Sequence, residues 1–301
     1  MHIPVLIDKV IEFLKPKENR IYIDATLGCG GYTEKILNVS KGCKIIGIDW
    51  DSQAIEYSKE RLKDFLNNGD VIIVKDNFIN LKKILKDLKI SQVDGVIFDF
   101  GLSTLQIKSC RGFSFNDDTL DMRMSDSFGN VSAYDVVNKF SKQHLTDIFY
   151  SYGEEKFGRL IAKKIVEYRK NKEIKSAKQL SEIVESLLHS RTKKLFLKNS
   201  KQKVKLKFHP ATKIFQAIRI FVNNELKNIE IGVNDAIDVL SSSGRVIAIC
   251  YHSLEDRIVK NIFKNRSDCK VITKKPVVAS DEEIKFNRSA RSAKLRVVEK
   301  L

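Results

Sequence analysis

Short, uniformly apolar runs alternate along this chain with longer segments whose apolar residues recur at helical spacing. An uninterrupted short apolar run is typical of a strand buried on both faces of a parallel sheet, and spacings of three and four residues predict amphipathic helices. The alternation therefore predicts an α/β fold with a mainly parallel sheet. The predicted strands cover residues 21–24, 44–48, 71–74, 93–98 and 245–250, with an edge strand at 271–273 and a final strand at 293–298, and the predicted helices of the core cover residues 2–14, 32–37, 52–67, 81–88, 212–226, 229–240 and 256–264.

The pattern changes between the fourth and fifth predicted strands. After a long loop, residues 132–188 show only helical spacing, with no convincing strand. We therefore expect an α/β core in two parts, residues 1–107 and 209–301, interrupted by a loop and a helical insertion over residues 108–208. The insertion ends in a run, residues 191–207, with eight basic residues and no acidic one. Such a run fits either a solvated segment or an arm that contacts phosphates.

A glycine-rich turn follows the first predicted strand. Gly28, Gly30 and Gly31 come directly after a strand that ends in Asp24, and the second strand ends in Asp49. Strand, glycine turn, helix, strand and acid together predict a site for a nucleoside-bearing ligand, with the second acid placed to accept hydrogen bonds from ribose hydroxyls. The third glycine of a dinucleotide fingerprint is absent. The pattern therefore favours a ligand with an amino-acid tail and no phosphates, such as S-adenosylmethionine, over an ordinary tight turn without a ligand.

Two further positions lie where loops leave the predicted sheet at its carboxyl edge. Asp99 ends the fourth strand and is followed by a glycine turn, which is where such folds place reactive groups. Phe78 follows the third strand and is suited either to stack on an adenine or to fill the core.

In the long loop, Arg111 and Arg123 fit either phosphate contacts or pairing with nearby aspartates.

Composition narrows the class of protein. The chain has 301 residues, 43% of them hydrophobic, which is enough for a sizeable core. The net charge of +16 favours a polyanionic partner such as nucleic acid, although a lysine-rich proteome is an alternative source of that charge. The five cysteines are scattered, with no C-x-x-C pair, and the N-terminus shows no secretory signal. We therefore expect a reduced, cytoplasmic protein with no membrane span and no metal site.

Several stretches taken together resemble one family, the bacterial 16S ribosomal RNA cytosine-N4 methyltransferases that act at the decoding centre. The resemblance covers essentially the whole chain, and its most specific parts are Arg-Gly-Phe-Ser-Phe and His-Ser-Leu-Glu-Asp-Arg. The matching stretches are residues 2–6, 24–31, 48–51, 99–103 with Gln106, 111–115, 120–124, 209–213 with 216–219, 252–257, 275–276 and 291–296.

The resemblance implies a Rossmann-like class I methyltransferase sheet with an inserted, mainly helical substrate-recognition domain. It also implies S-adenosylmethionine as the cofactor and a set of residues that contact it. Two departures from the family pattern concern that set: Tyr32 stands where the family usually has histidine, and Thr104-Leu105 stands where it has Ser-Pro. The implied cofactor contacts are Gly30, Gly31, Tyr32, Asp49, Phe78, Asp99 and Gln106.

The implied activity is methyl transfer to N4 of a cytidine in 16S ribosomal RNA, cytosine 1402 by the family resemblance. The partner would be that RNA within the assembled small subunit, bound by a monomer or a homodimer. Because the exocyclic amine is a poor nucleophile, we expect Asp99 to accept its proton while the site aligns the reactants. The base must be unstacked. Candidate residues to receive, orient or hold the RNA are Phe113, Phe115, His252, Arg257, Arg111 and Arg123.

Other functions compete with this hypothesis. His252 has an alternative role in satisfying backbone groups at the end of a strand. For the whole chain, the rivals are a nicotinamide-dependent oxidoreductase, which the missing third glycine disfavours, and a non-catalytic RNA-binding or assembly module. The intact glycines and the presence of Asp49 disfavour the second rival.

Overall fold

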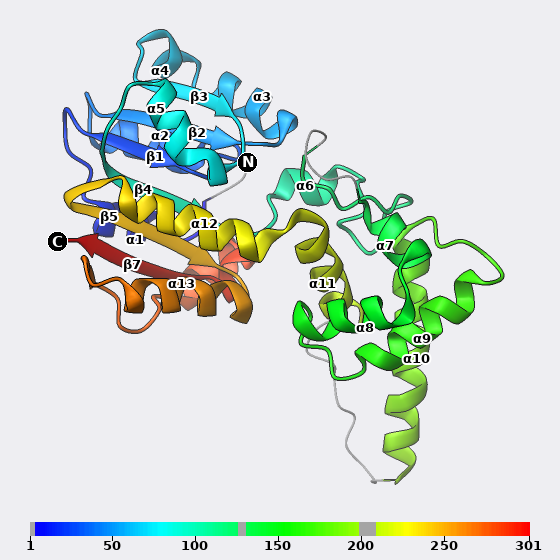
Figure 1. The fold of residues 1–301 in the computed structure, drawn as a ribbon. Coiled ribbons are helices and arrows are strands. Elements are labelled where there is room, and N and C mark those ends of the chain that lie inside the picture. The colour runs from blue at the N-terminus through cyan, green and yellow to red at the C-terminus, as the bar shows by residue number, and fades with distance from the viewer. Residues whose placement is uncertain (1–3, 126–130, 199–208) are drawn as a thin grey trace. The chain divides into compact units, whose positions relative to one another are not determined.

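The computed structural model describes residues 4–125, 131–198 and 209–301. The chain divides into two compact units (Figure 1), the first made of Met1–Ser103 with Leu226–Leu301 and the second of Thr104–Glu225. The basic run at 191–207 lies partly outside the described residues, and no side chain of its described part is characterised. Among the described residues, no helix is both long and apolar enough to cross a bilayer.

The first unit contains the predicted sheet. Its seven strands lie in the order β3-β2-β1-β4-β5-β7-β6, and the five from β3 to β5 are mutually parallel, whereas β7 runs antiparallel to both of its neighbours. The chain order reverses between β1 and β4, so the carboxyl ends of these strands flank the ligand-binding edge of such a sheet. The strands are β1 Ile21–Asp24, β2 Lys44–Asp49, β3 Val71–Lys75, β4 Val93–Asp99, β5 Leu240–Cys250, β6 Cys269–Val271 and β7 Lys294–Lys300.

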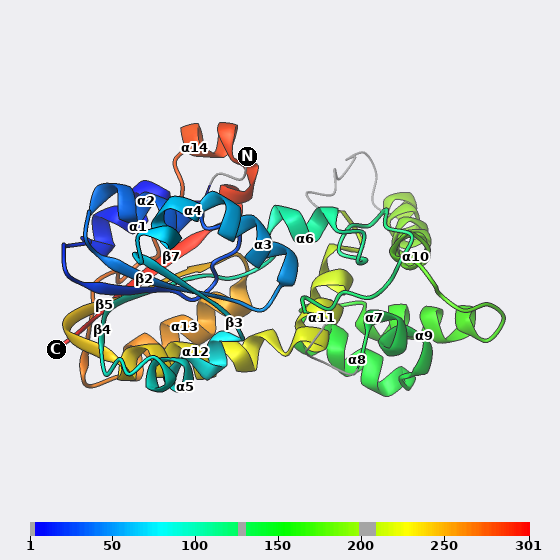
Figure 2. The ribbon, with the colours of Figure 1, turned by 90° about the horizontal axis from the view of Figure 1, so that it is seen from above.

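Helices cover both faces of this sheet, which is the doubly wound arrangement expected for it (Figure 2). On one face α5, α12 and α13 pack on the side chains of Ile23, Ile46 and Phe98; on the other, α1, α2 and α3 pack on those of Tyr22, Ile45 and Ile97. Because successive strand residues point to opposite faces, the continuous apolar runs supply both cores. The helices are α1 Ile7–Leu14, α2 Gly31–Val39, α3 Ser52–Arg61, α4 Lys63–Asn67, α5 Leu81–Asp87, α12 Glu225–Asp238, α13 Ser253–Asn265 and α14 Asp281–Phe286, with short 3₁₀ helices at Phe78–Asn80 and Arg288–Ser292.

Several element boundaries differ from expectation; for example, α1 begins only at Ile7 and α12 already at Glu225. The helix predicted over residues 52–67 is divided at Leu62 into α3 and α4. Strand β5 begins at Leu240, which pairs with Val93, and a register shift separates this pair from the regular ladder that starts at Arg245. Residues 241–244, between the predicted helix and the predicted strand, therefore belong to an irregular strand.

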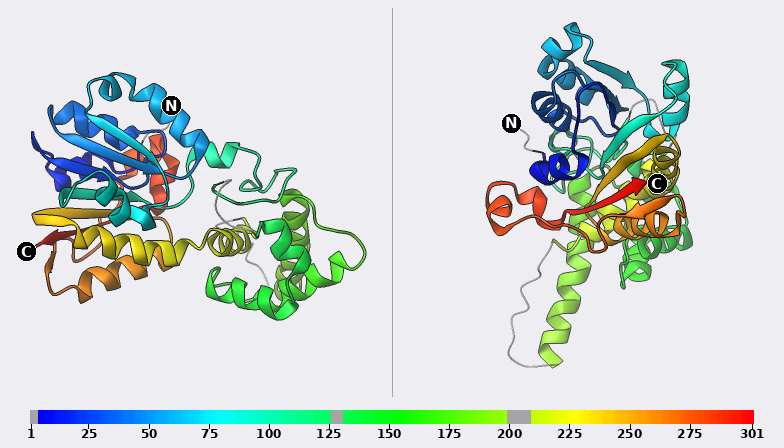
Figure 3. Two further views of the ribbon diagram at one scale, coloured as in Figure 1. Left: turned by 45° about the horizontal axis from the view of Figure 1, so that its top comes forward. Right: turned by 90° about the vertical axis from the view of Figure 1, so that its left-hand side faces the viewer.

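The second unit is helical, as expected, but it extends further than the sequence predicts. It includes α11, which packs on α7 and α8, so the boundary expected between residues 208 and 209 is wrong. Helix α11 ends before Asn224, whose left-handed backbone (φ 53°) separates it from α12. The unit (Figure 3) consists of α6 Thr104–Lys108, α7 Ala133–Lys139, α8 Lys142–Ser151, α9 Gly158–Arg169, α10 Ala177–Lys198 and α11 Thr212–Asn223.

Candidate functional site

The glycine turn connects β1 to α2, and other residues pack closely against its backbone. Gly30 caps α2 with φ 75°, and a Cβ at this position would lie 2.9 Å from the Leu62 side chain. A Cβ on Gly31 would lie 2.4 Å from Cγ of Pro4, within the stretch that precedes α1. Only glycine tolerates both the backbone conformation and the approach. The turn is therefore built so that the backbone runs close to the carboxyl edge of the sheet.

Asp49 ties the end of β2 to this turn. Its Oδ2 accepts a hydrogen bond from the backbone N–H of Gly28 at 2.8 Å, and its Oδ1 accepts one from the N–H of Asp51 at 2.9 Å. Each carboxylate oxygen carries a second lone pair that can still accept a hydrogen bond. Asp49 is therefore fixed in direction by backbone N–H groups and retains acceptor capacity, which is the pattern that binds ribose hydroxyls.

Asp24 lies buried at the end of β1. Its Oδ2 accepts a hydrogen bond from the hydroxyl of Thr33 at 2.8 Å, whereas its buried Oδ1 has no hydrogen-bond partner of good geometry among the described residues. A buried acceptor of this kind is costly unless a donor reaches it. The atom marks a place where a ligand ammonium group, directly or through water, would find an acceptor.

Asp99 ends β4 beside the same turn. Its backbone N–H donates to Oγ1 of Thr26 at 2.7 Å. Thr26 is the second residue after β1, so this bond fixes the end of β4 to the start of the glycine turn. The hydroxyl of Tyr251 donates to Oδ1 of Asp99 at 2.6 Å, and the hydroxyl oxygen of Tyr32 lies 3.3 Å from Oδ2. The carboxyl group is thus held between α2 and the end of β5.

Burial raises the pKa of each of these carboxyl groups. The pKa of Asp24 and that of Asp49 rise to about 6, and the pKa of Asp99 rises to about 7, in each case first because desolvation disfavours the charged form. Neighbouring carboxylates raise them further: Asp49 acts on Asp24, Asp51 acts on Asp49, and Asp24 and Glu255 act on Asp99. The edge of the sheet therefore concentrates negative charge and favours a ligand that carries positive charge.

Two of the predicted cofactor contacts, Tyr32 and Phe78, make contacts with other residues of the protein. The hydroxyl of Tyr32 donates to the backbone carbonyl of Val5 at 2.6 Å, and Tyr32 is buried. The ring of Phe78 is half-buried and meets Phe98 edge-on, with ring centroids 5.4 Å apart. A Cβ on Gly232 would lie 2.4 Å from the Phe78 ring, so α12 also packs against it. The core role that we gave as the alternative for Phe78 describes most of its contacts.

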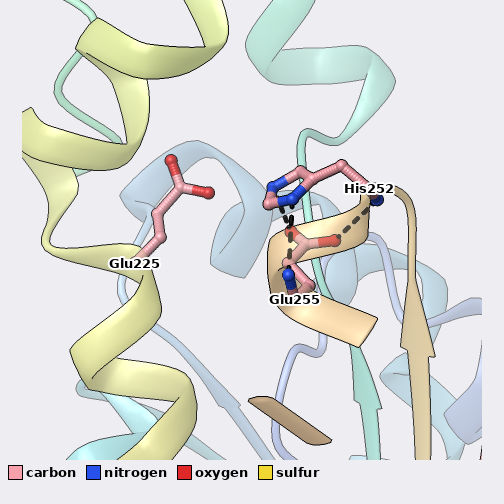
Figure 4. A group of neighbouring side chains, drawn as sticks. All are labelled: Glu225, His252 and Glu255. Atoms are coloured by element: carbon pink, nitrogen blue, oxygen red, sulfur yellow. Dashed lines mark hydrogen bonds and ion pairs between the residues drawn. The ribbon is translucent and has the colours of Figure 1, made fainter. Parts of the chain in front are cut away.

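His252 serves the end of a strand, as the alternative interpretation expected. It caps α13: its Nδ1 accepts the backbone N–H of Glu255 at 3.4 Å, and Glu255 Oε2 accepts the N–H of His252 at 3.3 Å (Figure 4). Glu255 Oε2 also accepts the backbone N–H of Tyr251 at 2.7 Å. This capping box therefore fixes the backbone from which the Tyr251 side chain reaches Asp99. Arg257 lies exposed on the same helix.

The arginines of the long loop bind within the second unit. Arg111 donates through Nη1 to the backbone carbonyl of Met124 at 3.1 Å and through Nε to the hydroxyl of Ser109 at 2.9 Å. Arg123 forms a paired contact with Asp121, at 2.6 and 3.0 Å. Arg123 thus takes the aspartate-pairing role given as its alternative, and Arg111 donates to a backbone carbonyl and to a serine hydroxyl of the same loop.

The two phenylalanines of this loop that are candidates to receive the base, Phe113 and Phe115, differ in exposure. Phe113 is buried at 8% exposure, with the Arg111 guanidinium 5.7 Å from its ring centroid, so the stacking surface expected there is covered. Phe115 is half-exposed and stacks on His209, with ring centroids 4.1 Å apart. Gln106 is buried in α6 and belongs to the second unit, whereas the other predicted cofactor contacts belong to the first.

Tyr251 is the residue that our sequence reasoning missed. Its signal was positional: it comes immediately after β5, the strand that pairs with β4, just as Asp99 comes at the end of β4. Parallel neighbours end at the same edge of a sheet, so a hydroxyl-bearing residue there could have been paired with Asp99 in advance. From the stretch that follows β5, the residue pattern leads us to expect only His252 and Arg257 in the site.

Known proteins that are similar to this chain are methyltransferases. The model of the MraW methylase family matches residues 1–301. A ribosomal RNA small subunit methyltransferase H from Sulfurihydrogenibium sp. is 47% identical over 98% of this chain and 98% of its own length, and one from Endomicrobium trichonymphae is 43% identical over 99% and 98%. An rRNA methylase structure from Streptococcus thermophilus aligns over 100% of this chain and 99% of its own with a TM-score of only 0.47 and 12% identity, and we draw nothing from it. The matched relatives and family model cover the chain throughout, and it belongs to the MraW methylase family.

Proposed function

We propose that this protein transfers a methyl group from S-adenosylmethionine to N4 of a cytidine in 16S ribosomal RNA. The observation that carries the proposal is the charge of the site: three carboxyl groups, the buried Asp24 and the partly buried Asp49 and Asp99, meet at one edge of the sheet, and their strongest charged neighbours are other carboxylates. A sulfonium ligand with an ammonium group supplies positive charge there. The pyrophosphate of a dinucleotide would add negative charge instead.

The residues fit the parts of that cofactor. The acceptor capacity that remains on the Asp49 carboxylate suits ribose hydroxyls, because backbone N–H groups already fix its direction. Oδ1 of Asp24, which has no hydrogen-bond partner of good geometry in the described part of the chain, suits the ammonium of the amino-acid tail. Gly30 and Gly31 let the backbone approach without a Cβ. When bound, the cofactor supplies an electrophilic methyl group.

Asp99 is the group that we assign to the proton. Transfer forms one bond between N4 and the methyl carbon, breaks one carbon–sulfur bond and releases one proton from the amine. A carboxyl group with a pKa of about 7 is ionised in part at neutral pH and can still hold a proton, which suits a general base. Tyr251 and Thr26 hold Asp99 in place, so alignment is set before the substrate arrives.

The RNA side of the site rests on fewer residues. Among the described aromatic residues of the long loop, Phe115 has an exposed part, and its ring is already paired with His209. Arg257 is exposed on α13 and suits a phosphate. We further propose that the RNA is met in the assembled small subunit.

The test measures methylated cytidine in small-subunit RNA by mass spectrometry. Purified protein is incubated with labelled cofactor and either naked 16S RNA or small subunits from cells that lack it. We expect label at N4 of one cytidine in the wild type and a loss of at least about a hundredfold in Asp99→Asn, within the range that general base catalysis contributes. Full activity of Asp99→Asn would remove Asp99 from the chemistry. Tight binding of NADH, measured by fluorescence, would favour the oxidoreductase rival.

A further inference from the structure

Two tyrosines hold the Asp99 carboxyl group, and they treat its oxygens differently. Tyr251 Oη lies 2.6 Å from Oδ1, and Tyr32 Oη lies 3.3 Å from Oδ2. Burial and the negative charge of Asp99 raise the pKa of both phenols well above their usual value near 10, so each keeps its hydrogen. Each phenol therefore has one hydrogen to donate.

The hydrogens can be assigned from the partners. For Tyr32, the carbonyl oxygen of Val5 at 2.6 Å can only accept, so the hydrogen of Tyr32 points there. The longer contact between Tyr32 Oη and Asp99 Oδ2 then contains no hydrogen while Asp99 is ionised, and it gains one when Oδ2 is protonated. For Tyr251, the hydroxyl donates to Oδ1 and stabilises the ionised form. The two oxygens are therefore inequivalent, with Oδ1 held as an acceptor and Oδ2 placed to carry a proton.

The backbone beneath Tyr251 is fixed independently of its hydroxyl. Glu255 Oε2 accepts the N–H of Tyr251 at 2.7 Å, and the capping box of α13 holds Glu255 in turn. Removing only the phenolic oxygen should therefore leave the chain path unchanged. The same packing keeps Glu255, from α13, and Asp24, from β1, near enough to raise the pKa of Asp99, whereas the hydrogen bond from Tyr251 lowers it.

We propose that Tyr251 is a positioning residue for methyl transfer: it keeps Asp99 ionised through Oδ1 and leaves Oδ2 to take the proton from the amine. The proposal rests on the proposed role of Asp99 as proton acceptor. Tyr32 completes the arrangement because its oxygen accepts the hydrogen that arrives on Oδ2.

The experiment compares pH profiles of the single-turnover rate with saturating cofactor. A hydrogen bond to a charged group contributes enough to shift a pKa by about one unit. In Tyr251→Phe the acidic limb of the profile should therefore move up by about one pH unit, which gives a roughly tenfold slower rate near pH 6 and a rate close to wild type at pH 9. In Tyr32→Phe the limb should not move up, because that hydroxyl donates to Val5.

Tyr22→Phe is the matched control. Tyr22 is buried in the same unit, and its hydroxyl oxygen accepts the backbone N–H of Lys17 at 2.9 Å rather than contacting Asp99. Its profile should keep the wild-type limb. A loss in Tyr251→Phe that is equal at every pH would show a merely structural role and would overturn the proposal.

A second readout needs neither cofactor nor RNA. Tyrosine labelled with ¹³C at Cζ gives eight signals at most, and the Tyr251 signal is identified by its absence in Tyr251→Phe. This signal should titrate near pH 7 in the wild type and stay flat in Asp99→Asn. If Asp99→Asn is inactive, but Tyr251→Phe leaves the acidic limb unmoved and the Tyr251 signal does not titrate in the wild type, only the role of Tyr251 fails. If Asp99→Asn is fully active, the proposed function of Asp99 fails instead.

Discussion

Replacing Asp49 by asparagine tests the cofactor site most directly. The carboxylate accepts two backbone N–H groups, of Gly28 at 2.8 Å and of Asp51 at 2.9 Å, one on each oxygen. An asparagine has one oxygen and one amino group, so one of these N–H groups must face a donor. An unsatisfied donor costs about 1–3 kcal/mol. Part of that cost is offset because the substitution also removes a buried charge whose pKa is raised to about 6.

The effect on binding is larger than the effect on folding. Hydrogen bonds from ribose hydroxyls to a carboxylate contribute about 1.5–3 kcal/mol each, and the asparagine loses at least one of them. Since about 1.4 kcal/mol corresponds to a factor of ten, the dissociation constant for S-adenosylmethionine should rise about 10- to 100-fold. In the wild type, affinity should also weaken below about pH 6 as Asp49 takes up a proton, and Asp49→Asn should lack this contribution.

The assay is isothermal titration calorimetry at pH 8, where Asp49 is ionised. Asp94→Asn is the matched control, because Asp94 also accepts a backbone N–H, that of Ile21 at 3.0 Å, but near the start of β4 rather than at the carboxyl edge. Its affinity should equal that of the wild type. If Asp49→Asn bound the cofactor within threefold of the wild type, the ribose role of Asp49 would be refuted.

Three further predictions concern stability. The three strand-end carboxyl groups have pKa values of about 6 to 7, well above those of an unfolded chain, so the ligand-free folded protein binds more protons than the unfolded chain. Its free energy of unfolding should therefore fall by at least about 1.4 kcal/mol as the pH rises from 5.5 to 7.5. Urea midpoints that stay constant or rise over this range would contradict this. Gly31→Ala should cost about 1–3 kcal/mol in urea unfolding, since its Cβ would lie 2.4 Å from Pro4, and an unchanged midpoint would show that the turn is not tightly packed. Asn223→Ala should lower the hydrogen-exchange protection of residues 111–125, because this buried amide bonds the Met122 carbonyl at 2.7 Å and the Met124 N–H at 2.8 Å; wild-type protection would count against that role.

Local sequence was sufficient where a feature depends on neighbours along the chain. The apolar runs identify strands β1 to β4 to within a residue, because the central strands of a parallel sheet are largely buried on both faces and the edge strand β3 is also mainly apolar. Asp24, Asp49 and Asp99 were found for the same reason: each ends such a run, and parallel strands bring their ends to one edge. The glycines of the turn were equally readable, since only glycine meets the backbone conformation and packing there.

Tertiary structure alone decided what each of these groups contacts. Tyr251 and Asp99 are separated by 152 positions in the chain, and their hydrogen bond exists because β4 and β5 are neighbours across an insertion. The ring of Phe78 packs on the core because α12 returns over it, and Arg111 binds backbone oxygens because the long loop folds back on itself. Helical spacing identifies α11 as a helix but does not say which unit it joins, because an amphipathic face specifies burial without specifying a partner.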